Sequence, residues 1–100
     1  MEKSQEWEWK SRARAYEEQL RRAKEELTLL EQREQELQDK ILGLTSLGYA
    51  PKQFSYEVFQ LQITRDSMPR ARLEIDRAQR ALDQFKDDAR KEGVLPGWLR

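Results

Sequence analysis

The chain has 100 residues, of which 19 are basic and 19 acidic, so its formal net charge is zero and it has no general attraction for nucleic acid or anionic lipid. It contains no cysteine and no histidine, which excludes disulfides, thiolate metal sites and the most common general base. A composition with 38% charged and 37% hydrophobic residues is typical of long, solvated helices rather than of a compact α/β core.

A heptad pattern fills the first half of the chain. Its members recur at alternating steps of four and three residues, and Glu34 is the one charged member. They are Trp9, Ala13, Tyr16, Leu20, Ala23, Leu27, Leu30, Glu34, Leu37, Ile41 and Leu44. The pattern predicts one helix over about residues 4–47, with an apolar stripe that faces another helix. Ser4 is its predicted N-cap.

The next segment predicts a short turn over residues 48–51. Gly48 is suited to the left-handed conformation that ends a helix, and Tyr49 is then placed to fold back on Leu44 in a Schellman motif. Pro51 is compatible with the first turn of a following helix, because the missing N–H needs no partner there.

A second heptad pattern predicts a helix over about residues 52–92. Its members are Phe54, Val58, Leu61, Arg65, Met68, Ala71, Ile75, Ala78, Leu82, Phe85 and Ala89, with Arg65 as the one charged member. Pro69 removes a helical hydrogen bond, so we expect a kink or a short break there, and Ser67 is placed to cap a restarted helical segment.

When the two predicted helices are placed antiparallel, the second stripe matches the first, and the numbers of facing residues add to 98 or 99. Glu34 then lies opposite Arg65. We expect a buried ion pair that fixes the register, because removing one partner of such a pair costs roughly 3–5 kcal/mol. The predicted fold class is all-α: an antiparallel two-helix coiled-coil hairpin, kinked near Pro69, forming one domain over residues 1–100 and able to dimerise into a four-helix bundle.

The tail over residues 93–100 is apolar, and the hairpin places it beside the start of the first helix. We therefore expect Trp7, Trp9 and Trp98 to close the open end as an aromatic cluster. The alternative is a tail that docks on another chain.

Large apolar residues outside the two stripes gather around the turn. They are Leu42, Leu47, Tyr49, Tyr56, Phe59 and Ile63, called the turn-end patch below. We expect a non-enzymatic interaction module, a scaffold, adaptor or regulatory subunit, whose patch binds a protein partner or, preferably, a second copy of the chain. The alternative is that these side chains only cover the turn.

Two other functions are open at this point. A nucleic-acid-binding arm would use two basic stretches: Arg12, Arg14, Arg21, Arg22 and Lys24, and then Arg65, Arg70, Arg72, Arg77 and Arg80. Acidic residues interrupt or face both stretches, which favours a salt-bridged surface instead. A lipid-touching turn would use Leu47, Tyr49 and Phe59 and is the weakest alternative.

No motif in the chain carries chemistry. There is no glycine-rich phosphate loop, no serine-centred elbow and no Glu-x-x-His pair, so we expect no catalytic residue, no cofactor and no metal. No run approaches the ~18 apolar residues of a membrane span, and the charged start shows no leader. Together these features favour a cytoplasmic location.

Overall fold

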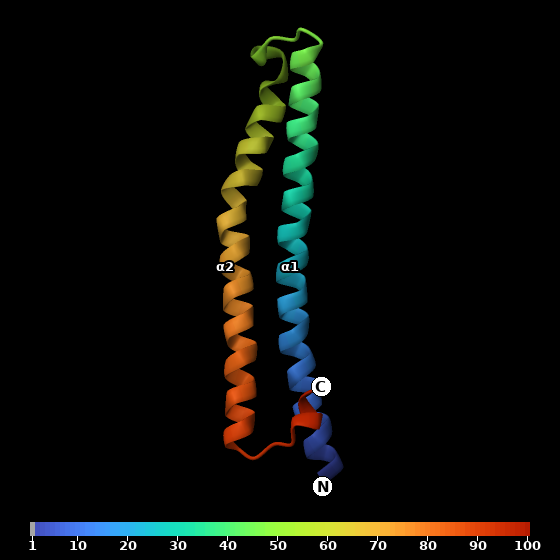
Figure 1. Cartoon of the computed structure of the whole chain (residues 1–100), viewed down its shortest axis with the longest axis vertical. Helices are drawn as coiled ribbons and strands as arrows, with labels where there is room; N and C mark the ends of the chain where they lie inside the picture. Colours follow the sequence, from blue (N-terminus) through green and yellow to red (C-terminus); the bar gives the residue numbers. More distant parts are fainter. Residues whose placement is uncertain (1) are drawn as a thin grey trace. The chain divides into compact units, whose positions relative to one another are not determined.

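The chain is all-α, with two long helices packed antiparallel in a hairpin (Figure 1), as the sequence predicts. The structure, a computed structural model, describes residues 2–100, with side chains from Ser4 onward. Its elements are α1 (Glu2–Ser46), η1 (Pro51–Phe54), α2 (Ser55–Lys91) and η2 (Pro96–Leu99), and no strand occurs among the described residues. Since α1 begins at Glu2, Ser4 lies inside the helix and is not its N-cap.

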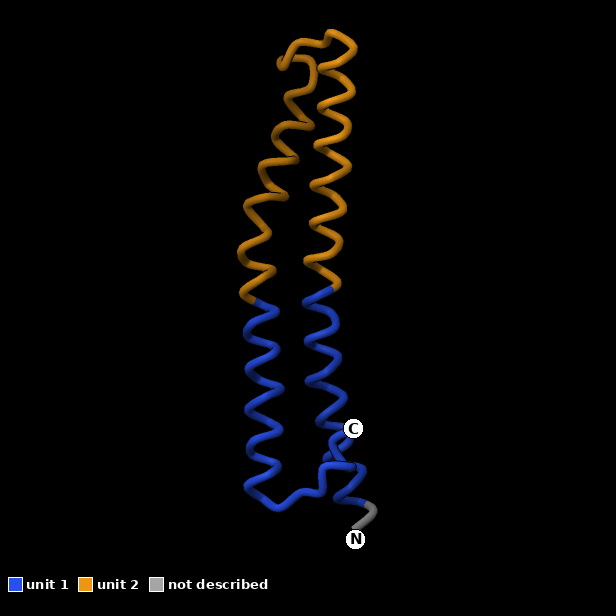
Figure 2. Tube along the Cα trace, viewed as in Figure 1, with its two compact units in different colours: residues 1–24, 74–100 blue, residues 25–73 orange. Residues whose placement is uncertain are grey.

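The contacts group into two compact units (Figure 2). The turn unit, Glu25–Leu73, contains the connection between the helices. The end unit contains the residues up to Lys24 together with Glu74–Arg100. Each unit contains one segment of α1 and one of α2.

The turn begins with the predicted Schellman motif. Gly48 has a φ of 90°, which only glycine adopts without strain. The N–H of Tyr49 donates to the carbonyl of Leu44 at 3.1 Å, and that of Gly48 donates to Thr45 at 3.0 Å, which confirms the predicted cap. The same pair of bonds recurs at Gly93, where Val94 donates to Ala89 and Gly93 to Arg90.

The segment after the turn differs slightly from the predicted helix start. Pro51 opens a single 3-10 turn, and α2 follows it directly. Gln53 stabilises this start twice: its N–H donates to the carbonyl of Ala50, and its side-chain oxygen accepts the N–H of Ala50, both at 2.8 Å. Phe54, the last residue of η1, is buried, with 5% of its surface exposed.

The core is the seam between the helices. All eleven predicted seam members in α1 are buried or half-buried, and so are nine of the eleven from Phe54, in η1, to Ala89 of α2. The two exceptions are Val58 and Arg65, which are exposed, while Glu57 and Thr64 take their places. With Glu57 and Thr64 as the seam residues, the seam from Phe54 to Ala89 recurs in an unbroken alternation of three and four residues.

The interhelical contacts agree with the predicted register. In the turn unit, Lys40 pairs with Glu57 and Glu34 with Arg65, and these numbers add to 97 and 99. In the end unit, the ring of Phe85 contacts those of Trp9 and Tyr16, on either side of the buried Ala13 that the register places opposite it.

Helix α2 continues through Pro69 without a break, and its ribbon bends in this stretch (Figure 1). Ser67 does not cap a restarted helix. Its hydroxyl donates to the carbonyl of Ile63 at 2.9 Å, and that of Thr64 donates to Gln60 at 2.8 Å. Such backward bonds bend helices, so they and the proline act in the same stretch.

Two glycines give opposite predictions. Gly48→Ala should lower the free energy of unfolding by roughly 1–2 kcal/mol, because alanine is strained at positive φ. Gly43→Ala should raise it by about 0.5–1 kcal/mol, because Gly43 is helical and an added Cβ there meets nothing within 4 Å. Urea unfolding followed by circular dichroism measures both; equal effects of the two substitutions would contradict the turn described here.

Candidate interaction surface

The turn-end patch is exposed at every one of its six positions, all of them in the turn unit. The exposed fractions are 66% for Leu42, 77% for Leu47, 47% for Tyr49, 65% for Tyr56, 60% for Phe59 and 43% for Ile63. Local structure sets this exposure. The Schellman cap turns the chain at Gly48, and Phe54 is the one aromatic ring of this stretch that is buried.

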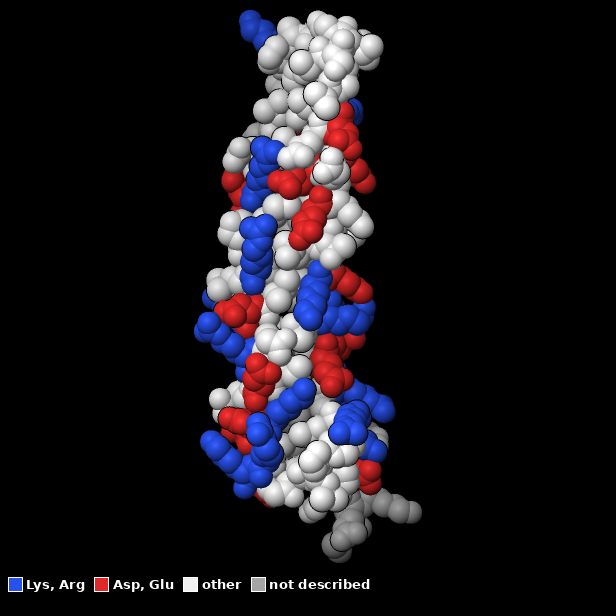
Figure 3. All heavy atoms as spheres, viewed as in Figure 1, with Lys and Arg blue, Asp and Glu red and all other residues white. Residues whose placement is uncertain are grey.

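Charge is nearly absent from the same stretch. Of the 24 residues from Ile41 to Thr64, only Lys52 and Glu57 are charged, in a chain where 38% of the residues carry charge. The space-filling view shows this end almost free of red and blue, whereas charges of both signs are spread over the rest of the face in view (Figure 3). The patch therefore combines exposed apolar area with a lack of the charges that usually cover a helical surface.

Val58 belongs to this surface, although its hydrophobicity predicted a seam position. It is 44% exposed, and the neighbouring Glu57 occupies the seam instead. The carboxylate of Glu57 lies 3.3 Å from the Lys40 ammonium of α1. A hydrogen bond within its own residue, to the backbone, lowers the pKa of Glu57, and a hydrogen bond from Lys40 lowers it further. The regular alternation of three and four residues was the sequence signal that could have placed Val58 correctly.

The Glu34–Arg65 pair is present, but it lies at the surface. Arg65 Nε donates to Glu34 Oε2 at 3.1 Å, and the two side chains are 46% and 27% exposed. The expectation of a buried pair is therefore wrong, because the seam at this level is formed by Thr64, whose hydroxyl is satisfied within α2. A solvated pair contributes about 0.2–1 kcal/mol, far less than a buried one.

The end unit brings together a different aromatic set from the one expected. Phe85 stacks on Tyr16 at a centroid distance of 4.9 Å and contacts Trp9 at 5.6 Å. The guanidinium of Arg12 lies over the rings of Trp9 and Phe85, 4.6 Å from the centroid of the Trp9 ring. Among the described residues no ring contact joins Trp9 to Trp7 or Trp98; Trp7 is 71% exposed, and Trp98 is half-buried in η2.

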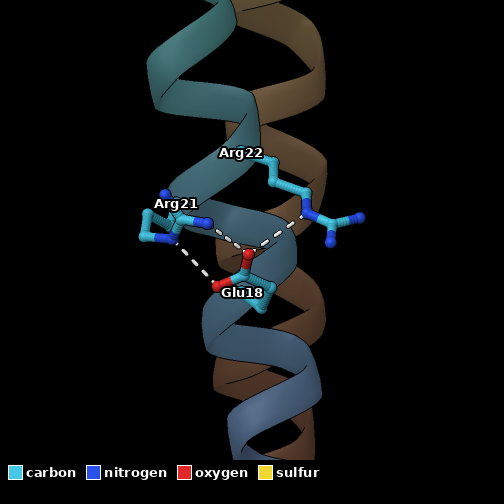
Figure 4. Close-up of polar contacts among 3 residues, drawn as sticks. All are labelled: Glu18, Arg21 and Arg22. Atoms are coloured by element: carbon cyan, nitrogen blue, oxygen red, sulfur yellow. Dashed lines mark hydrogen bonds and ion pairs between the residues drawn. The ribbon is translucent and has the colours of Figure 1, made fainter.

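Ion pairs within each helix engage many of the arginines. Glu18 is the clearest case, because its carboxylate accepts three hydrogen bonds (Figure 4). Two come from Arg21, from Nε at 2.9 Å and from Nη2, and the third comes from Arg22 Nε at 3.2 Å. The hydrogen bond from Arg21 lowers the pKa of Glu18 to about 2, with Arg22 adding to the effect. In α2, Arg77 pairs with Glu74 and Arg80 with Asp76.

These pairs reduce the positive charge that either basic stretch presents. A nucleic-acid-binding arm stays an untested prediction.

No three acidic side chains lie together as a metal site among the side chains described, residues 4–100, and no helix of the described chain is long and apolar enough to cross a membrane. Comparison with protein-family models, curated proteins and solved structures finds no match for this chain.

The Glu34–Arg65 pair predicts a small coupling energy. In a double-mutant cycle with Glu34→Ala and Arg65→Ala, urea unfolding should give a coupling of about 0.2–1 kcal/mol that falls as salt is added. A coupling above roughly 3 kcal/mol would mean that the pair is buried after all.

The low pKa of Glu18 predicts a pH dependence. Its folded value of about 2 lies below the ordinary value of 4.5, so its stabilising contribution is complete above about pH 4.5 and is lost as the pH falls toward 2. Carboxyl-carbon NMR should show Glu18 with a pKa of about 2, well below the ordinary glutamate value of 4.5, and Glu18→Gln should weaken the acid dependence of unfolding. A Glu18 midpoint near 4.5 would contradict the arrangement in Figure 4.

Proposed function

We propose that this chain is a non-enzymatic coiled-coil interaction module, a scaffold, adaptor or regulatory subunit that binds another protein chain through the turn-end patch. The observation that supports this proposal is the exposure of all six patch side chains on a stretch with only two charges. Burying a large apolar side chain gains roughly 1.5–3 kcal/mol, so a partner that covers several of them gains enough for specific binding.

The alternative, that the patch merely covers the turn, has less support. Phe54 is the aromatic side chain that is buried in this stretch, with 5% of its surface exposed, and backbone and Gln53 hydrogen bonds hold the turn without help from the patch side chains. The patch side chains keep at least 43% of their surface exposed. They add little to the hairpin itself, so their apolar character is best explained by a partner.

A site-specific cross-linking experiment tests this proposal. A photoreactive phenylalanine analogue placed at Phe59, and separately at Leu47, should cross-link to another polypeptide chain in the cells that produce this protein. Gln32, exposed in the charged part of the same unit, is the matched control position. We expect cross-linked product several-fold above the control at both patch positions; a yield equal to that at Gln32 would rule out the patch as a binding surface.

A further inference from the structure

A second heptad stripe runs along α2 on the face opposite the seam. Ile63, Asp66, Arg70 and Leu73 recur at steps of three, four and three residues, and all four are exposed. Asp66 lies two residues from the buried Thr64 and two from the buried Met68, which places it about 200° around the helix from each. All four residues belong to the turn unit. We call them the outer stripe; continued toward the turn it includes Phe59 and Tyr56 of the patch.

The outer stripe is complementary to itself when a second copy runs antiparallel. A two-fold axis that pairs residues whose numbers add to 136 sets Asp66 against Arg70 of the second copy and Ile63 against its Leu73. Because the contact is isologous, each pair occurs twice. The centre then holds two acidic and two basic side chains in opposed pairs, with an apolar layer on either side.

We propose that a second copy of this chain docks on α2 in this antiparallel register, giving a homodimer that covers the outer stripe, including Ile63 of the turn-end patch. This inference rests on the proposed function and names the partner. In a parallel arrangement, Asp66 would meet Asp66 and Arg70 would meet Arg70. Sliding the antiparallel copy one heptad toward the turn would set Asp66 against Ile63 and Arg70 against Phe59. Both alternatives leave charges unpaired or repelling, which selects the proposed register.

The two charged side chains are available for this role in the single chain. Asp66 and Arg70 are one helical turn apart, yet no ion pair joins them; Asp66 accepts a hydrogen bond from Gln62 at 2.8 Å, and Arg70 makes no ion pair in the described part of the chain. Ile63 and Leu73 are 43% and 46% exposed. Docking therefore breaks no salt bridge and gains apolar burial on both sides of the charged centre.

A charge-swap series tests the register. Asp66→Arg and Arg70→Asp each create like-charge contacts twice in the dimer, whereas the double variant Asp66→Arg with Arg70→Asp restores both pairs with reversed sign. Sedimentation velocity on the full chain should show a concentration-dependent dimer for the wild type. We expect each single variant to raise the dissociation constant at least about tenfold and the double variant to return it close to the wild-type value.

The control variant is Glu31→Arg, which reverses one exposed charge on α1 of the same unit and should leave the dissociation constant unchanged. Circular dichroism establishes that all variants are helical. A wild type that stays monomeric up to about 500 µM, or a double variant no tighter than the singles, overturns this inference. If the wild type is monomeric while cross-links from Phe59 reach a different polypeptide, the proposed function survives and only self-docking fails; a monomer without such cross-links removes both.

Discussion

The structure depends on one apolar seam between the antiparallel helices α1 and α2. In each helix the seam residues recur with the same alternation of three and four residues. A helix in a protein gains most of its stability from packing an apolar face, so neither helix is expected to be stable without the other. Small residues in the seam let the helices approach: Ala13 and Ala89 in the end unit and Ala71 in the turn unit are at most 3% exposed. Large neighbours such as Phe85 fill the space they leave.

The sequence predicted the features that follow from a repeated or unique residue pattern. The α1 stripe was predictable because ten of its eleven members are uncharged, and the Schellman cap because Gly48 is the residue best suited to a positive φ there. Two seam positions in α2 were not. Val58 is more hydrophobic than its neighbour Glu57, and Arg65 could pair with Glu34, but the seam uses Glu57 and Thr64. Hydrophobicity decided the prediction at Val58, and the expected ion pair with Glu34 decided it at Arg65. In the folded chain the regular spacing prevails at both, because one helix presents one continuous face.

Polar residues can occupy the seam because their hydrogen bonds are made nearby. Thr64 donates to a carbonyl of its own helix, and Glu57 is paired with Lys40 at the seam edge. No buried side-chain polar atom lacks a partner in the described part of the chain. These local bonds are invisible to a hydrophobicity pattern. The aromatic set of the end unit was missed for a similar reason: spacing predicts which rings lie near the open end, but the contact of Phe85 with Trp9 and Tyr16 depends on side-chain direction.

The same one-residue choice in the seam also shapes the surface of the turn unit. Taking Glu57 inward removes the only acidic side chain of residues 41–64 from the outer face, and the displaced Val58 adds apolar area there. Because the seam takes every third or fourth residue, it leaves Phe59, Ile63, Asp66 and Arg70 together on the opposite face of α2. The exposed apolar surface is thus a direct consequence of how the hairpin closes. A substitution that returned Val58 to the seam would change the core and the exposed apolar face at once, since both belong to one helix with a single rotation about its axis.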